Sequence, residues 1–87
     1  MSPKLTPSPP GATIRDILEE RGISQKELAR RMRRPQKTIS EIINGKARIT
    51  PQTAIQFEKR LAGTAEFWVT REALYRLALA RRKRKKP

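Results

Sequence analysis

The sequence of 87 residues contains no cysteine and no histidine, and aromatic residues make up only 5% of it. These absences exclude disulfides, thiolate or imidazole ligands for zinc or haem, cysteine nucleophiles and histidine bases. We therefore expect no metal, no small-molecule cofactor and no enzymatic activity. No apolar run approaches the roughly 20 residues that cross a bilayer, and the proline-rich start lacks the apolar segment of a signal peptide. Together these absences predict one small, soluble, cytoplasmic domain with no membrane partner.

Positive charge is what the chain has in excess. It carries 21 Lys and Arg against 8 Asp and Glu, a formal net charge of +13. An excess of this size favours a polyanionic partner, with nucleic acid ahead of an anionic membrane surface. About half of it lies at the ends, in a proline-rich segment (1–10) that we interpret as a disordered arm and in a basic tail (81–87). Within the domain between them, 11–80, the excess falls in residues 24–48, where eight basic and two acidic side chains give +6.

Apolar residues recur at helical spacing in five segments, and no segment alternates like a strand. The pattern predicts an all-α fold with helices over about 12–21, from 24 to the break at Pro35, from there to 43, from 51 to about 61, and over about 65–80. Their predicted buried side chains are Ile14, Ile17, Leu18, Leu28, Ala29, Met32, Ile39, Ile42, Ile43, Ala54, Phe57 and Leu61.

Residues typical of helix ends punctuate these segments. Gly22 stands where a helix closes with a left-handed residue. Ser24 and Glu27 have capping-box spacing, which predicts that the Ser24 hydroxyl bonds the Glu27 amide while the Glu27 carboxylate reaches back to the Ser24 amide. Thr50 before Pro51, and Thr64, predict two further helix starts.

The second and third predicted helices, about 24–44, have the proportions of a helix-turn-helix and coincide with the +6 segment. The unit resembles the Cro and phage-repressor (XRE) family, which implies a five-helix, lambda-repressor-like DNA-binding domain. The matching residues are Gln25, Leu28, Ala29, Ile39, Asn44, Gly45 and Lys46. Arg33 stands where the family usually has glycine, so either Arg33 adopts a left-handed conformation or the turn is reshaped. Pro35 replaces the usual Ser or Thr cap.

The helix-turn-helix geometry predicts which side chains meet DNA. The second helix of the unit lies in the major groove with its N-terminal residues at the base edges. The predicted base-reading residues lie outside the face formed by the three isoleucines; they are Gln36, Lys37, Thr38, Glu41 and, more weakly, Ser40. The predicted phosphate contacts are Gln25, Lys26, Arg34, Lys46 and Arg48.

The fifth predicted helix has more apolar surface than one core-facing stripe requires. Its predicted inward stripe consists of Phe67, Leu74, Leu77 and Ala78. Trp68, Tyr75 and Leu79 then lie toward other sides and are the predicted interface of a homodimer that would suit a palindromic operator. The alternative is that Trp68 completes the core of its own domain.

A longer resemblance covers about residues 10–80. It rests on Pro10-Gly11, S-Q-K-E-L-A-R-R-M with P-Q-K-T-I-S-E-I-I-N-G-K at 24–46, I-T-P-Q-T-A at 49–54 and A-E-F-W at 65–68. Together these segments are similar to the HigA family of toxin–antitoxin antitoxins. The resemblance implies a dimeric antitoxin that binds operator DNA, represses transcription of its own operon and neutralises a RelE-like ribonuclease toxin.

Two alternatives stay open from the sequence. One is a stand-alone XRE-type repressor of phage or mobile-element origin that has no toxin. The other is a non-specific nucleic-acid or membrane-surface binder in which the basic tail does most of the binding.

Overall fold

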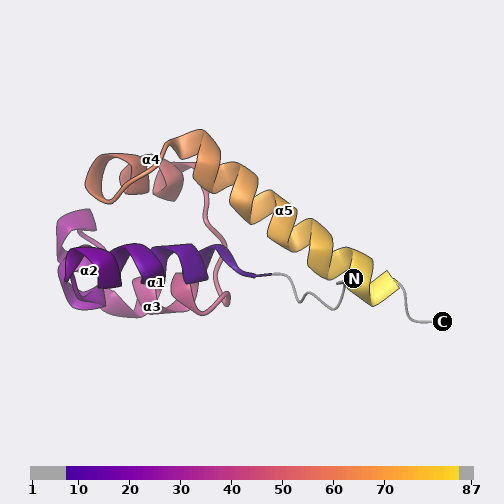
Figure 1. Cartoon of the computed structure of the whole chain (residues 1–87), viewed down its shortest axis with the longest axis horizontal. Coiled ribbons are helices and arrows are strands. Elements are labelled where there is room, and N and C mark those ends of the chain that lie inside the picture. The colour runs from indigo at the N-terminus through magenta and orange to yellow at the C-terminus, as the bar shows by residue number, and fades with distance from the viewer. Residues whose placement is uncertain (1–7, 85–87) are drawn as a thin grey trace.

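The computed structural model describes residues 8–84, and within them it contains five α-helices and no strand (Figure 1). The helices are α1 (Pro10–Arg21), α2 (Gln25–Met32), α3 (Gln36–Ile43), α4 (Pro51–Arg60) and α5 (Ala65–Arg84). The predicted all-α, five-helix fold is confirmed. The first four helices gather at one end of the molecule, and the second half of α5 extends away from them (Figure 1).

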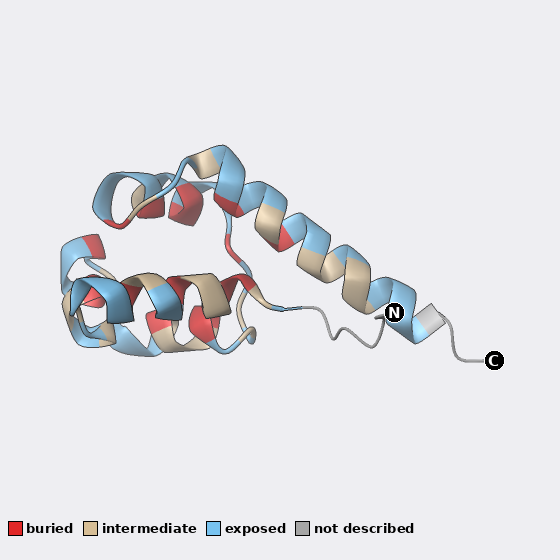
Figure 2. Cartoon of the chain, in the orientation of Figure 1, coloured by how far each residue is buried: buried red, intermediate tan, exposed pale blue. Residues whose placement is uncertain are grey.

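One apolar core joins all five helices. It contains every side chain predicted to be buried in the first four helices except Ile17, which packs against it half-buried, and it adds Ile49 and Trp68. Ala29, Ile39 and Phe57 are almost completely enclosed. Figure 2 shows that the buried residues lie where the helices meet and that α5 has none beyond Glu72 among the described residues. The core therefore stops where α5 leaves the other helices.

Local capping decides most of the helix ends, as predicted. The Ser24 hydroxyl accepts a hydrogen bond from the Glu27 amide at 3.0 Å, and the Thr50 hydroxyl accepts one from the Thr53 amide at 3.2 Å. The Thr64 hydroxyl accepts from the Phe67 amide at 3.0 Å. Gly22 closes α1 in the left-handed conformation, with φ 67°. Each of these contacts satisfies a backbone group that the helix itself leaves open.

Two helix boundaries differ from the prediction. Helix α1 begins at Pro10, earlier than expected, because a proline at the first helical position needs no amide partner. Helix α5 continues through residues 81–84, the first part of the predicted basic tail. Arg and Lys are strong helix formers and interact favourably with the negative end of the helix dipole, so basic composition alone does not end a helix. The rest of the predicted arm (1–7) and tail (85–87) lies outside the described residues.

The orientation of α5 reverses the sequence-based prediction. Trp68 is fully buried, its ring centroid lies 5.1 Å from that of Phe57, and its indole N–H donates to the Ala62 carbonyl at 2.8 Å. Of the predicted inward stripe, Phe67, Leu74 and Leu77 are 43%, 59% and 43% exposed, and Ala78 is half-buried. Neighbouring positions on a helix differ by about 100°, so burying Trp68 turns Phe67 outward. Trp68 is therefore wrong as a dimer-interface residue, because none of its surface is accessible to a partner.

Helices α1 and α3 approach each other at Gly11. A Cβ atom at this position would lie only 1.8 Å from the carbonyl oxygen of Ile43 at the end of α3. Glycine is thus required for the two helices to pack this closely. The contact fixes the C-terminal end of α3 against the rest of the fold.

Among the described residues, no helix is long and apolar enough to cross a membrane.

Candidate nucleic-acid interface

The turn between α2 and α3 is closed by Arg33 in the left-handed conformation, with φ 56° and ψ 44°. Its amide donates to the carbonyl of Arg30 at 3.2 Å, and the Arg34 amide donates to the carbonyl of Ala29 at 3.0 Å. These two bonds form a Schellman motif, which glycine normally closes. Arg33 therefore takes the glycine conformation, and the turn keeps its usual shape at the expense of some backbone strain.

Pro35 is the N-cap of α3 and makes no side-chain cap hydrogen bond. The proline φ of −61° already suits the helix start, and its carbonyl accepts from the Thr38 amide at 3.0 Å. The helix buries Ile39, Ile42 and Ile43. It thus presents its remaining, polar side to the surface.

The predicted base-reading residues lie on this polar side of α3. Gln36 and Lys37 are exposed, and Thr38, Ser40 and Glu41 are half-exposed. All five are accessible while the isoleucine face is not, so the structure places them on one surface of the helix. Their contact with bases stays a prediction.

A hollow of about 390 Å³ brings the start of α2 together with the start of α3. Its lining includes Lys26 and Arg34, two of the predicted phosphate contacts, and Gln36, a predicted base reader. Gln25 is half-buried beside Lys26 and does not line the hollow. The arrangement suits the phosphate backbone of a DNA strand that passes over the hollow while α3 faces the bases.

Lys46 and Arg48 lie at the opposite end of α3, exposed in the loop that leads to α4. Two arginines from other helices hold this loop. The Arg76 guanidinium donates to the Gly45 carbonyl at 3.3 Å, and the Arg15 guanidinium donates to the Asn44 side-chain carbonyl at 3.2 Å. Sequence reasoning missed both supports, because they join residues 31 and 29 positions apart with no local signal.

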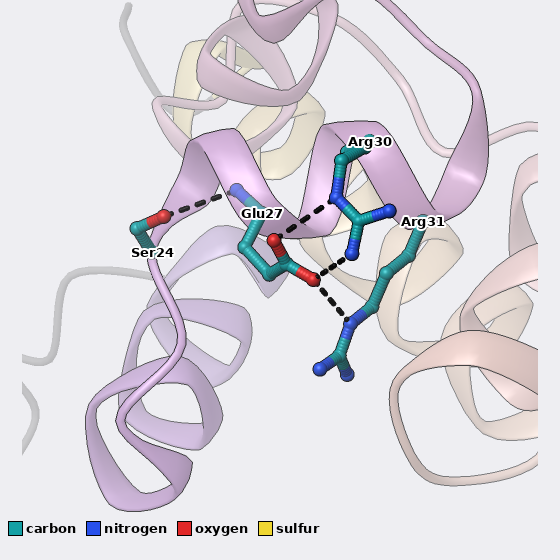
Figure 3. A network of polar contacts seen from close by, with 4 residues as sticks. All are labelled: Ser24, Glu27, Arg30 and Arg31. Carbon is teal, nitrogen blue, oxygen red and sulfur yellow. Dashed lines mark hydrogen bonds and ion pairs between the residues drawn. The ribbon is translucent and has the colours of Figure 1, made fainter.

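Glu27 does not complete the predicted capping box. Figure 3 shows its carboxylate between the guanidinium groups of Arg30 and Arg31, while the Ser24 hydroxyl alone caps the helix. Glu27 accepts from Arg30 through both oxygens and from Arg31 Nε at 3.0 Å. These hydrogen bonds, that of Arg30 first, lower the pKa of Glu27 to about 2. Two arginines at the right spacing on its own helix outcompete the single Ser24 amide for a charged oxygen.

The outer side of α5 carries a second candidate surface. Phe67 and Leu74, with Glu66, Thr70 and Arg71, line a mostly apolar hollow of about 350 Å³, and Leu77 is exposed further along the helix. Of the predicted dimer residues, Tyr75 and Leu79 are half-buried. We call Phe67, Leu74 and Leu77 the outer stripe.

A helix-turn-helix family model matches residues 14–68, well over half of the chain, and the chain belongs to this family. An E. coli (strain K12) relative named as the uncharacterized HTH-type transcriptional regulator YddM is 32% identical over 71 residues, covering 82% of this chain and 76% of the relative.

Solved structures of similar fold include antitoxins and antidote proteins. A Nostoc punctiforme protein named as a putative antidote protein of a plasmid maintenance system is 30% identical, with a TM-score of 0.88 and coverage of 94% of this chain and 90% of that one. The Pseudomonas aeruginosa antitoxin HigA, solved with the higBA promoter, is also 30% identical, with a TM-score of 0.81 and coverage of 86% and 83%. The resemblance to HigA-type antitoxins that the sequence motifs indicated is thereby confirmed.

Proposed function

We propose that the protein is a sequence-specific DNA-binding antitoxin that represses transcription of its own operon in the cytoplasm. One observation carries the proposal: α3 exposes a polar face over a buried isoleucine face, next to a hollow that carries Lys26 and Arg34. This is the arrangement by which a helix-turn-helix reads the major groove while cations hold the strand backbone. The P. aeruginosa HigA structure with its promoter supports the same use of the fold.

The chain acts as a homodimer in this proposal. The outer stripe is an exposed apolar surface on the helix that extends away from the other four, which is where a second copy can pack without covering α3. Tyr75 and Leu79, the other predicted dimer residues, are half-buried on the side of α5 that carries Trp68, so the outer stripe supplies the main contact in this proposal. A two-fold dimer would present its two reading helices about 34 Å apart, one turn of DNA, so the operator is expected to be palindromic.

Binding of a RelE-like ribonuclease toxin is the second half of the proposal. The family resemblance and the similarity to a plasmid-maintenance antidote protein support it. The test is to co-express the chain with the reading frame beside its gene and to isolate the complex. A stable complex that blocks the partner's ribonuclease activity is the expected result, and absence of any adjoining toxin frame would contradict it.

A second candidate function is a stand-alone transcriptional repressor with no toxin. The similarity to the E. coli regulator YddM favours it. The two candidates share operator binding and differ only in the toxin, so the same co-expression experiment separates them.

Operator binding is tested by comparing DNA from upstream of the gene with scrambled DNA at one stated salt concentration. Specific sites are typically bound a thousandfold or more tighter, so a ratio near one would overturn the proposal.

Gln36→Ala and Lys37→Ala should weaken binding to the operator and leave scrambled DNA nearly unaffected. Lys83→Ala removes one charge at an exposed position near the end of α5 and serves as the matched control. Equal losses on both DNAs for the α3 variants would mean that these residues do not read bases.

A further inference from the structure

Five basic side chains surround a hollow of about 480 Å³ between the end of α2 and the end of α4. We call it the basic hollow; its lining consists of Arg30, Arg31, Arg33, Lys59 and Arg60. No acidic side chain lines it. None of the five residues is among the DNA contacts predicted from the sequence, and Lys59 and Arg60 come from a helix outside the helix-turn-helix.

Helix stability accounts for only part of this charge. Basic residues in a last turn offset the negative end of a helix dipole, which amounts to about half a charge per helix. Glu27 supplies one more negative charge against Arg30 and Arg31. Five cations less one carboxylate and two helix ends leave an excess of about three positive charges. Arg33, Lys59 and Arg60 form no ion pair with any described residue. The excess is therefore available to an external anion.

The basic hollow is continuous with the surface proposed to hold DNA. Arg30 lines both the basic hollow and the hollow at the start of α2 and α3. Helix α2 has eight residues and is about 12 Å long, so the cations along it form a track of about that length. Glu27 holds Arg30 and Arg31 in place along the track (Figure 3). Duplex DNA carries about one negative charge per 1.7 Å of its axis and can match such a track, whereas a small anion occupies only one point of it.

We propose that the basic hollow binds backbone phosphates of the DNA that flanks the base-read site. The proposal rests on the function proposed above and extends its footprint. The hollow offers cations and no amide or hydroxyl side chain, so it adds affinity without sequence preference. The predicted consequence is that affinity depends on the length of the duplex beyond the operator.

The test compares a short duplex, limited to the footprint of the operator, with a long one that adds flanks on both sides. The variant is Lys59→Gln combined with Arg60→Gln, both exposed on the last turn of α4. The matched control is Arg82→Gln combined with Lys83→Gln, which removes the same two residue types from exposed positions on the distant end of α5 (Figure 1). Binding is followed by fluorescence anisotropy at 50 and 200 mM salt, about the range in which phosphate contacts dominate the salt dependence.

The wild-type protein should bind the long duplex more tightly, and this advantage should fall about tenfold between the two salt concentrations if two phosphates are held. The α4 variant should lose that advantage and keep its affinity for the short duplex. The control should affect both duplexes alike. Because Lys59 and Arg60 also stabilise the end of α4, thermal melting of the variant is measured, and Arg33→Gln provides a second variant on another element.

Equal losses on the short and long duplexes, or no loss on either, would overturn the proposal. The latter result would mean that the basic hollow serves another partner, such as an acidic segment of a protein. A wild-type operator-to-scrambled ratio near one would overturn the function proposed above instead. The two failures are distinguishable because one is read from duplex length and the other from duplex sequence.

Discussion

Trp68 lies in the core and not at a dimer interface, and its replacement by phenylalanine tests this placement. Trp68 is the single tryptophan of the chain. Its side chain has no exposed surface, and its indole N–H donates to the Ala62 carbonyl at 2.8 Å. Trp68→Phe keeps an aromatic ring next to Phe57 but removes this donor and part of the buried volume.

The expected cost has two parts. The lost hydrogen bond contributes about 0.5–1.5 kcal/mol, and the Ala62 carbonyl is left without its partner. The smaller ring leaves a void beside Phe57 and Gly63, for which about 1–2 kcal/mol is in line with large-to-small core substitutions. The free energy of unfolding should therefore fall by about 2–3 kcal/mol, which lowers the melting temperature by roughly 10–20 °C in a domain of this size.

Thermal melting by circular dichroism measures the loss, and sedimentation at several concentrations measures dimerisation. Trp68→Phe should lower the melting temperature and leave the dimer dissociation constant of the folded protein unchanged. Leu74→Ala, at a position that is 59% exposed, should do the opposite: it changes domain stability by about 0.5 kcal/mol or less and weakens the dimer. A Trp68→Phe protein with unchanged melting temperature and weakened dimerisation would refute the placement of Trp68 in the core.

Three further predictions concern the turn, the ion pair and the closest helix approach. Arg33→Gly should raise the free energy of unfolding by about 0.5–1 kcal/mol in urea denaturation, because glycine adopts φ 56° without strain; Arg33→Ala should give no such gain. Because the pKa of Glu27 is lowered, its pairing with Arg30 stabilises the fold fully above pH 4.5, the ordinary pKa of Glu, and this stabilisation is lost as the pH falls toward 2. Over this interval the melting temperature of the wild type should therefore approach that of Glu27→Gln. A difference between the two that does not depend on pH would contradict the pairing. Gly11→Ala should destabilise the fold by about 1–3 kcal/mol in the same urea assay, because its Cβ would overlap the Ile43 carbonyl. The control is Glu20→Ala, on the exposed side of α1. Equal stability of the two variants would show that α1 and α3 pack less closely.

Most of the fold could be predicted because its helix ends are decided by local chemistry. The contacts of Ser24, Thr50 and Thr64 each join residues three apart, and Gly22 needs no partner to adopt its positive φ. Such signals are complete within a few residues of sequence. The start of α1 and the end of α5 differ from the prediction, because proline and basic runs suggest disorder in the sequence although both are compatible with a helix end.

The orientation of α5 could not be predicted because its sequence is apolar on several sides. Phe67, Trp68 and Val69 follow one another, so periodicity does not select which of them faces the core. The choice is made by Phe57 and Ala62, which offer a ring contact and a carbonyl that fit an indole. These residues contact Trp68 only in the folded structure, so the spacing of apolar residues in α5 does not predict the contacts.

The candidate site was predictable where it lies within the helix-turn-helix and not where other helices complete it. The helical spacing of Ile39, Ile42 and Ile43 is enough to divide α3 into a buried face and a polar face. The basic hollow depends instead on the end of α4 meeting the end of α2. Lys59 and Arg60 belong to the part of 11–80 outside 24–48, whose net charge is zero. Net charge along the sequence averages over acidic side chains that point elsewhere in the fold, so it hides such a cluster.

Helix α5 links the two surfaces on which the proposed function depends. Its Arg76 holds the Gly45 carbonyl in the loop after α3, and Glu72 in turn pairs with Arg76 from one turn earlier. Leu77, the next residue, belongs to the outer stripe. Because one rigid helix carries both contacts, a dimer that packs through the outer stripe also sets where the two reading helices stand relative to each other. In the proposed dimer, the spacing of operator half-sites would thus be determined by the same helix that joins the subunits.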